Sequence, residues 1–338
     1  MVKIDRVSSS GMGYSGRFSG ELLLMQKLMM EAENFTMVSK FVLVGLTNDR
    51  KTQILLFVVI LIFYLFTLVG NFVIIILVQA DSRLHTPMYF FLTHLSSLEI
   101  CYVSSTVPQM LAHLFSGNGT ISFIRCATQM YIALSLGSTE GLLLGVMAYD
   151  RYLAICHPFI YAVAMDKWRQ LQLTTASWAG GFLLSMMNVG CTLRLPFCGP
   201  NHINHFFCEL PVVLKLTCAD TYATENIIFG AAVLILLIPL SVILTSYGLI
   251  LSTVLHMQSA AGRSKAFSTC ASHLAVVTLF YGTVISMYMR PRSSTTPDSD
   301  KKIAVFYIVV TPLLNPVIYT LRNKDVHGAL AKMLNTKH

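Results

Sequence analysis

The stretch Met147-Ala148-Tyr149-Asp150-Arg151-Tyr152-Leu153-Ala154-Ile155-Cys156-His157-Pro158 ends a long apolar run and places an acid beside a base at its foot. Ionisable groups are costly in or near a bilayer and are rare there unless they serve a function. The pair Asp150–Arg151 is therefore a candidate switch. We expect the rest of the chain to determine when it changes state.

The composition is that of a membrane protein. The 338 residues are 54% hydrophobic and 12% charged, with a formal net charge of +8, whereas soluble domains carry about 25% charged residues. The apolar residues gather in runs of about the length that crosses a bilayer as a helix, ~20 residues. A transmembrane β-barrel would instead show alternating segments of ~10 residues. The sequence therefore predicts an all-α membrane protein with seven transmembrane helices, over Ile54–Val78, Pro87–Leu111, Cys126–Ala148, Leu171–Val189, Ile227–Val254, Ala266–Met289 and Ile303–Leu321.

Two glycosylation sequons indicate the orientation. Asn34-Phe35-Thr36 precedes the first run and Asn118-Gly119-Thr120 joins the second to the third, so two crossings separate them and they share a side. Sequons are used outside the cell. We therefore expect the N-terminus outside, with glycans at Asn34 and, less securely placed in its short loop, at Asn118.

These boundaries divide the chain into three parts. Residues 1–53 form an extracellular tail, of which residues 1–29 are expected to be a disordered extension. Residues 54–321 form the seven-helix domain, and residues 322–338 form a cytoplasmic tail. Basic and apolar residues alternate in this tail, which favours a short amphipathic helix on the inner leaflet.

Four of the eight cysteines fall on the outer side of this topology. They are Cys126, at the start of the third run, and Cys198, Cys208 and Cys218 in the loop between runs four and five. An oxidising compartment would join them in two disulfides. Four cysteines allow three pairings, and their spacing does not choose among them.

Two acidic residues lie inside predicted spans. Glu99 and Glu140 each cost at least ~2.5–3.5 kcal/mol at the centre of a bilayer if charged. Either both are protonated and hydrogen-bonded, or they share a cation or a proton.

Several motifs, in order along the chain, are similar to those of a known family. Asp150-Arg151-Tyr152 after the third run and Asn315-Pro316-Val317-Ile318-Tyr319 in the seventh resemble the rhodopsin-class G-protein-coupled receptors. The three-cysteine loop and further motifs resemble the odorant receptors, in detail the tetrapod-type class. These motifs are Pro87-Met88-Tyr89-Phe90-Phe91-Leu92, Lys265-Ala266-Phe267-Ser268-Thr269-Cys270-Ala271-Ser272-His273 and Pro312-Leu313-Leu314-Asn315-Pro316, within a likeness that covers about residues 30–335.

The resemblance implies a function and a location. A receptor of this family binds small volatile molecules in the outer half of its bundle and couples to the olfactory stimulatory G protein and adenylyl cyclase. It is a multi-pass protein of the plasma membrane, in the cilia of olfactory sensory neurons, and trafficking chaperones are possible partners. We expect no enzyme activity, no nucleic-acid partner and no cofactor other than a structural or allosteric sodium ion.

The resemblance also implies specific residue pairs and sites. It pairs Cys126 with Cys208 and Cys198 with Cys218. It suggests a buried sodium-like cation site whose residues are Asn71, Glu99, Glu140 and Asn315.

The predicted ligand pocket is formed by the outer halves of spans three, five, six and seven. Its residues are small and apolar, with Ser138, Tyr281 and Tyr288 as hydrogen-bonding groups, so we expect a neutral, largely apolar odorant. The full set is Ala133, Leu134, Gly137, Ser138, Ile228, Ala231, Ala232, Ile235, Tyr281, Val284, Ile285, Tyr288, Val305 and Ile308.

The predicted switch lies at the inner end. The foot of span six carries Arg263 and Lys265 and no nearby acid, so Arg151 has only Asp150 and Tyr247 as candidate partners. The residues expected to serve activation and G-protein coupling are Asp150, Arg151, Tyr152, Tyr247, Asn315, Pro316 and Tyr319.

Two alternatives remain open. A receptor of this type could bind a non-volatile metabolite outside the nose. A small-solute transporter would show internal repeats and broken helices with paired charges, and the sequence has no visible repeat.

Overall fold

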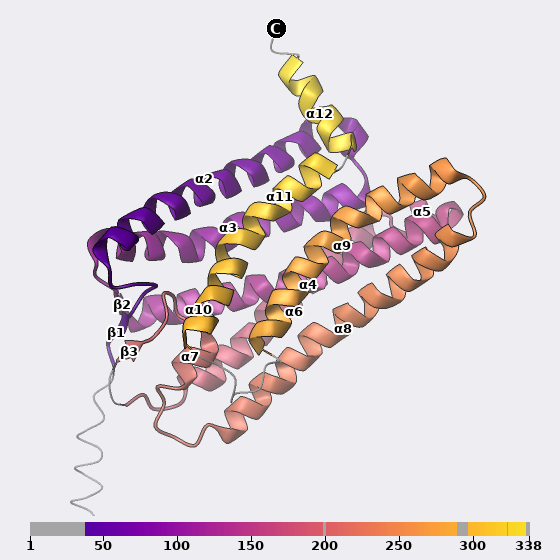
Figure 1. Ribbon diagram of the computed structural model, residues 1–338. Helices are drawn as coiled ribbons and strands as arrows, with labels where there is room; N and C mark the ends of the chain where they lie inside the picture. Colours follow the sequence, from indigo (N-terminus) through magenta and orange to yellow (C-terminus); the bar gives the residue numbers. More distant parts are fainter. Residues whose placement is uncertain (1–37, 199–200, 289–296, 323, 336–338) are drawn as a thin grey trace, which may run out of the picture.

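The computed structural model describes residues 38–198, 201–288, 297–322 and 324–335, so the predicted glycosylation site Asn34 lies outside the described residues. Within them, seven long helical segments run side by side and correspond to the seven predicted runs (Figure 1). They are α2 (Arg50–Ala80), α3 (Pro87–Ser116), α4 (Phe123–Cys156), α6 (Lys167–Leu193), α8 (Tyr222–Leu255), α9 (Ala260–Tyr288) and a seventh segment made of α10 (Pro297–Val305), the π-helix η3 (Phe306–Val310) and α11 (Thr311–Arg322).

The helices present an apolar surface suited to lipid. Five segments are long and apolar enough to cross a membrane by length and hydropathy alone, and α3 and α6 are 30 and 27 residues long. Large apolar side chains stay exposed on the outward faces, such as Phe66 on α2 and Leu244 on α8, which are 64% and 65% exposed. Extended apolar surface of this kind marks contact with a membrane.

Most helices begin and end beyond the apolar runs that predict them. Asp49, Ser122 and Asp166 each accept a hydrogen bond from a backbone N–H in the first turn of α2, α4 and α6. Such caps satisfy donors that have no partner within the helix, so polar residues extend the helices past the hydrocarbon region. As a result α4 continues to Cys156 and carries the Asp150–Arg151 pair within the helix itself.

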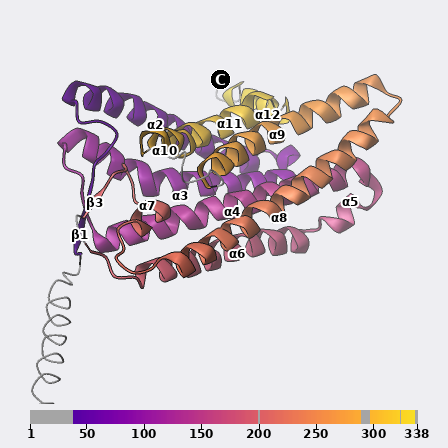
Figure 2. The same cartoon turned by 60° about the horizontal axis from the view of Figure 1, so that its bottom comes forward.

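Helix α4 crosses the middle of the bundle and packs against α3, α6, α8 and α9 (Figure 2). Small residues permit its closest approaches. A Cβ atom added at Gly145 would lie 2.9 Å from the Pro239 side chain of α8. A Cβ atom added at Gly181 of α6 would lie 2.8 Å from the Ser135 carbonyl oxygen. Close helix contacts through small residues are typical of membrane bundles.

A small sheet closes one end of the bundle. Strand β1 (Lys40–Leu43) pairs antiparallel with β2 (Thr120–Ser122) and parallel with β3 (His202–Ile203), with Phe41 opposite Ile121 and Val42 opposite His202. The short helix α7 (Leu210–Leu214) lies at this end, which we call the outer end (Figure 1).

The opposite end, which we call the inner end, carries α5 (Pro158–Ala164) and the turn between α8 and α9 (Figure 1). The 3₁₀ turn η1 (Ser82–Leu84) connects α2 to α3. The last helix, α12 (Lys324–Asn335), contacts η1 and α2, in the part of the chain where a C-terminal helix is predicted.

Candidate functional site

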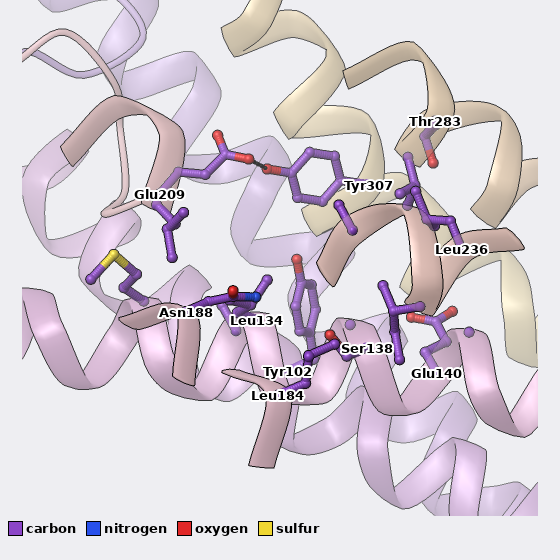
Figure 3. A pocket seen from close by; sticks show the side chains of 18 of the residues that line it. Tyr102, Leu134, Ser138, Glu140, Leu184, Asn188, Glu209, Leu236, Thr283 and Tyr307 are labelled. Atoms are coloured by element: carbon purple, nitrogen blue, oxygen red, sulfur yellow. Dashed lines mark hydrogen bonds between the residues drawn. The ribbon is translucent and has the colours of Figure 1, made fainter. Parts of the chain in front are cut away.

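A cavity of about 130 Å³ lies in the outer half of the bundle. It is bounded by α3, α4, α6, α8, α9 and the seventh segment, and the loop after β3 covers it (Figure 3). Most of its wall is apolar, with a few polar groups among the lining residues. Enclosed apolar cavities with a few placed polar groups are typical small-molecule sites.

The loop that covers the cavity is held from several directions. Cys208 forms a disulfide with Cys126 at the start of α4, and its backbone N–H donates a hydrogen bond to Gln129 Oε1 over 2.9 Å. Gln129 Nε2 in turn donates to the Ser105 carbonyl oxygen of α3. The next residue, Glu209, begins α7 and accepts the α7 backbone N–H of Val213 through its carbonyl oxygen. The backbone of Glu209 is therefore fixed at the edge of the cavity.

Glu209 and Tyr307 form a hydrogen bond at the edge of the cavity. The Tyr307 hydroxyl donates to Glu209 Oε1 over 2.8 Å, and both residues line the cavity (Figure 3). Tyr307 belongs to the π-helix η3, whose wider turn rotates the residues that follow relative to an α-helix. The covering loop is thus joined directly to the seventh segment.

His205, at the start of the same loop, is neutral at pH 7. Its ring is 1% exposed and stacks on Phe206 with centroids 4.7 Å apart. Burial, and then the Lys301 ammonium, lower the pKa of His205 to about 3. Its Nε2 lies 3.7 Å from Glu209 Oε2, a separation too long for a hydrogen bond. A neutral ring at this distance does not form an ion pair.

Eight of the predicted ligand residues line the cavity. They come from two helices and from the outer part of α9, and they are Ala133, Leu134, Gly137 and Ser138 of α4, Ile228, Ala232 and Ile235 of α8, and Val284 of α9.

Five other predicted ligand residues do not line it. The Tyr281 hydroxyl instead donates to the Gly141 carbonyl oxygen over 3.1 Å, inside the contact between α9 and α4. Ile285 is 40% exposed on the outside of α9. Ala231 is buried away from the cavity, and Ile308 and Val305 pack in the core between the seventh segment and its neighbours. The side chain of Tyr288 lies outside the described residues.

The cavity also contains residues that the sequence did not place there. Some of these residues come from α3, α6 and the covering loop, which were not expected to contribute. Others come from α4, α8, α9 and the seventh segment. The polar members are Tyr102, Glu140, Asn188, Glu209, Thr283, Tyr307 and Thr311. Glu209 alone carried a usable signal, because a disulfide between Cys126 and Cys208 brings the residue after Cys208 to the top of α4.

A cluster of buried polar groups lies next to the floor of the cavity. Glu99 is fully buried and accepts a hydrogen bond from Asn315 Nδ2, and Glu140 is close enough to interact with it. Oxygen atoms of both carboxyl groups, Glu99 Oε2 and Glu140 Oε1, have no hydrogen-bond partner in the described part of the chain. Asn71 donates to the Thr67 carbonyl oxygen of its own helix. Oxygen atoms are the ligands that hard cations prefer, although the described residues contain no group of three or more acidic, His or Cys side chains placed for a metal ion.

The inner end of α4 differs from the expected acid–base pair. Asp150 is fully buried and accepts a hydrogen bond from the Tyr161 hydroxyl of α5 over 2.9 Å. Burial and the adjacent carboxylate raise the pKa of Tyr161, so its hydroxyl keeps its proton and donates. No ion pair joins Asp150 to Arg151 among the described residues, and Arg151 Nε has no hydrogen-bond partner there. Successive residues of a helix point in different directions, so Tyr161 reaches Asp150 more easily than Arg151 does.

The other predicted switch residues contact parts of the chain other than Arg151. The Tyr247 hydroxyl and His273 Nδ1 are hydrogen-bonded at 2.6 Å and join α8 to α9. Tyr152 forms a hydrogen bond of 2.8 Å with His157 Nε2. Tyr319 is buried in the inner core, while Pro316 lies against Gly70 of α2.

The outer surface carries the disulfides and one described sequon. Cys126 is joined to Cys208 and Cys198 to Cys218, while Cys101, Cys156, Cys191 and Cys270 are free thiols. Asn118 is exposed, and its Oδ1 accepts a hydrogen bond of 2.9 Å from the Thr120 N–H. The glycan at Asn118 remains a prediction.

The fold is that of a rhodopsin-like seven-helix bundle. The crystal structure of squid rhodopsin is similar, with a TM-score of 0.64 and 16% sequence identity over 85% of this chain and 86% of that chain. The family model described as olfactory receptor matches residues 60–337.

Curated relatives agree with this class. Human olfactory receptor 2A1/2A42 is 51% identical over 89% of this chain and 97% of its own length. Human olfactory receptor 5L1 is 49% identical over 91% and 99%, and the dog olfactory receptor-like protein OLF3 is 48% identical over 90% and 96%. The chain belongs to the olfactory receptor family, which consists of multi-pass membrane receptors and not of enzymes.

Proposed function

We propose that this receptor binds a small, neutral, largely apolar volatile molecule in its outer cavity and activates the olfactory-type stimulatory G protein, which raises cyclic AMP. The observation that carries the proposal is the mostly apolar cavity under the disulfide-held loop, in a chain that belongs to the olfactory receptor family. A small ligand gains at most ~1.5 kcal/mol per heavy atom and usually less. We therefore expect affinities in the micromolar range.

Activation is proposed to be a population shift. A ligand changes the equilibrium only if it binds the active arrangement better than the inactive one. Tyr281 joins α9 to α4 through its hydrogen bond to the carbonyl oxygen of Gly141, which lines the cavity. Repacking around Tyr281 would move the inner end of α9 away from Arg151 and open a cleft for the G protein. Bound G protein should tighten ligand binding by the same factor, because the coupling is reciprocal.

The buried polar cluster is proposed to hold a sodium ion. The residues of this site are Asn71, Glu99, Glu140 and Asn315, and the carboxyl oxygens without hydrogen-bond partners support it. An ion there would offset the cost of burying two carboxylates. Purified receptor should unfold at a higher temperature in sodium chloride than in choline chloride, and Glu140→Gln should remove the difference. Equal unfolding temperatures for the wild type in both salts would refute the sodium site.

The cellular location of the protein is part of the same proposal. We propose that the protein works in the plasma membrane of olfactory sensory neurons, in their cilia, and that it reaches the surface with the help of trafficking chaperones. The lipid-facing surfaces of α2 and α8 support membrane residence.

A cyclic AMP screen of the surface-expressed receptor against a varied odorant panel tests the function. At least one volatile should raise cyclic AMP in receptor-bearing cells and not in mock-transfected cells. The Arg151→Ala receptor, matched for surface staining, should lose that response. A normal response from Arg151→Ala would refute the proposed switch. Uptake of a panel compound without cyclic AMP would refute the receptor function and favour a transporter.

A further inference from the structure

The formally charged groups that line the cavity are all acidic. Glu140 lies in its wall on α4, and Glu209 lies at its edge under the loop, while none of the described lining residues is Lys, Arg or His (Figure 3). Both carboxyl groups are buried, with the residues 6% and 4% exposed. The described part of the wall thus offers carboxyl oxygens as hydrogen-bond acceptors and contains no cation to receive an anionic ligand.

The acceptor at the edge of the cavity is fixed before any ligand arrives. Tyr307 holds Glu209 Oε1, and the disulfide of Cys208 holds the backbone beside it. Fixed acceptors favour a ligand that brings a donor, since little entropy is then lost on binding.

Other polar side chains add hydrogen-bonding capacity along the wall, among them the hydroxyl groups of Tyr102 and Thr311. Asn188 of α6 is 5% exposed, and its Oδ1 has no hydrogen-bond partner in the described part of the chain. Ser138 of α4 also lines the cavity. The remaining surface, from residues such as Leu134, Leu184 and Ile235, suits a hydrocarbon body.

We propose that the cavity selects odorants with a hydroxyl group, in which an aliphatic or aromatic body fills the apolar wall and the O–H donates to the Glu209 carboxyl group. This inference rests on the proposed function and specifies its ligand class. Aldehydes, ketones and ethers can accept from the hydroxyl groups of the wall, but they have no proton to donate to the Glu209 carboxyl group. Carboxylic acids would place a second negative charge beside Glu209 and Glu140.

A protonated amine fits less well than a hydroxyl. The buried Lys301 lies within electrostatic reach of His205, which is next to Glu209, and its positive charge acts on the same region. An ammonium group must also give up more hydration than a hydroxyl to enter a mostly apolar cavity. A neutral donor satisfies the carboxyl group at a lower desolvation cost.

The test uses matched ligands that share one carbon skeleton. The alcohol, its methyl ether, the aldehyde, the primary amine and the carboxylic acid are applied to cells that display the receptor, over several skeletons, and cyclic AMP is recorded. We expect the alcohol to be more potent than the ether and the aldehyde by about tenfold or more, which is ~1.4 kcal/mol and within the range of a hydrogen bond to a charged group. The acid should be silent.

The Glu209→Gln variant then tests whether the Glu209 carboxyl group causes the preference for alcohols. Its amide offers a donor as well as an acceptor, so the preference for alcohol over aldehyde should shrink or reverse, a change that a merely loosened loop would not produce. Glu225→Gln, on α8 outside the cavity, is the matched control and should keep the wild-type preference. Tyr307→Phe, which removes the hydroxyl that holds Glu209, should reduce the preference without reversing it. If Glu209→Gln does not reach the surface, this third variant provides the test of the residue.

The outcomes separate the inference from the proposed function. Equal potency of alcohol and ether, or greatest potency of the amine or the acid, would overturn the hydroxyl preference and leave the odorant receptor in place. If a receptor shown to be at the surface gave no cyclic AMP response to any of the ligand series, both the hydroxyl preference and the proposed receptor function would be contradicted.

Discussion

Ser138 is the one hydroxyl that α4 contributes to the wall of the cavity in the described structure. Replacing Ser138 by Ala removes its hydroxyl group, which is both a donor and an acceptor, without adding an atom. The EC50 of an oxygenated agonist should rise about fivefold, because a neutral hydrogen bond contributes about 1 kcal/mol. Dose–response curves for cyclic AMP measure this, with surface staining as the control. An unchanged EC50 would remove Ser138 from ligand recognition.

His205 makes the stability of the covering loop depend on pH. The folded protein keeps this ring neutral down to about pH 3, whereas the unfolded chain protonates it near pH 6.5. Stability is therefore complete above about pH 6.5 and decreases as the pH falls from there toward 3. At pH 5 the loss is about 2 kcal/mol, since each pKa unit corresponds to ~1.4 kcal/mol.

Thermal unfolding of detergent-purified receptor near pH 7.5 and pH 5 checks this expectation. His205→Phe keeps the stacking on Phe206 and removes the titrating group, so its unfolding temperature should decrease less on acidification than that of the wild type. The same decrease in both proteins would show that other groups cause it.

At the level of single residues, sequence reasoning recovered positions that depend on helix geometry and missed those that depend on tertiary contacts. Ala133, Leu134, Gly137 and Ser138 share one face of a helix, and periodicity alone predicts such a face. Tyr161 could not be predicted as the partner of Asp150, because the fold of the connection after α4 brings its hydroxyl there.

The packing of α6 against α4 depends on one glycine of an adjacent pair. A Cβ atom at Gly181 would lie 2.8 Å from the Ser135 carbonyl oxygen and 2.9 Å from the Thr139 backbone nitrogen, whereas one at Gly180 would meet only the Leu142 side chain at 3.4 Å. Backbone atoms cannot yield to the extra methyl group as the end of a flexible side chain can.

Gly181→Ala should therefore destabilise the receptor by roughly 1–3 kcal/mol, the usual cost of overpacking, and Gly180→Ala should be tolerated. Surface expression and the unfolding temperature of the two purified variants provide the comparison. Equal stability of the two variants would contradict the close α4–α6 contact.

At the level of elements, the long helices were predictable and the outer sheet was not. An apolar run of about 20 residues has few alternatives in a bilayer, since the helix alone satisfies its backbone groups there. Strands β1, β2 and β3 have four, three and two residues and come from distant parts of the chain. The π-helix in the seventh segment was also missed, because local sequence patterns do not distinguish it from an α-helix.

At the scale of the whole molecule, α4 connects the two ends of the receptor. Its outer half lines the cavity through Ala133 to Ser138, its middle carries Glu140, and its inner end carries Asp150 and Arg151. A ligand that repacks the contacts of α4 with α8 and α9 can change the environment of Arg151 without touching it. The central claim is that occupation of the outer cavity controls the G protein at the inner end.

Filling the cavity from the protein side tests this claim most directly. Gly137 lines the cavity, and an added Cβ atom there meets no heavy atom within 4 Å, so the leucine of Gly137→Leu has room to occupy ligand space. Gly230 on α8 is likewise open, but it is exposed on the surface of the bundle and does not line the cavity. Gly230→Leu is therefore a matched control for the same substitution within a helix.

The decisive measurement is agonist-evoked cyclic AMP from both variants at equal surface expression. We expect Gly137→Leu to raise the EC50 at least about tenfold or to abolish the response, and Gly230→Leu to respond like the wild type. An undiminished response from Gly137→Leu, or an equal loss in both variants, would contradict the central claim.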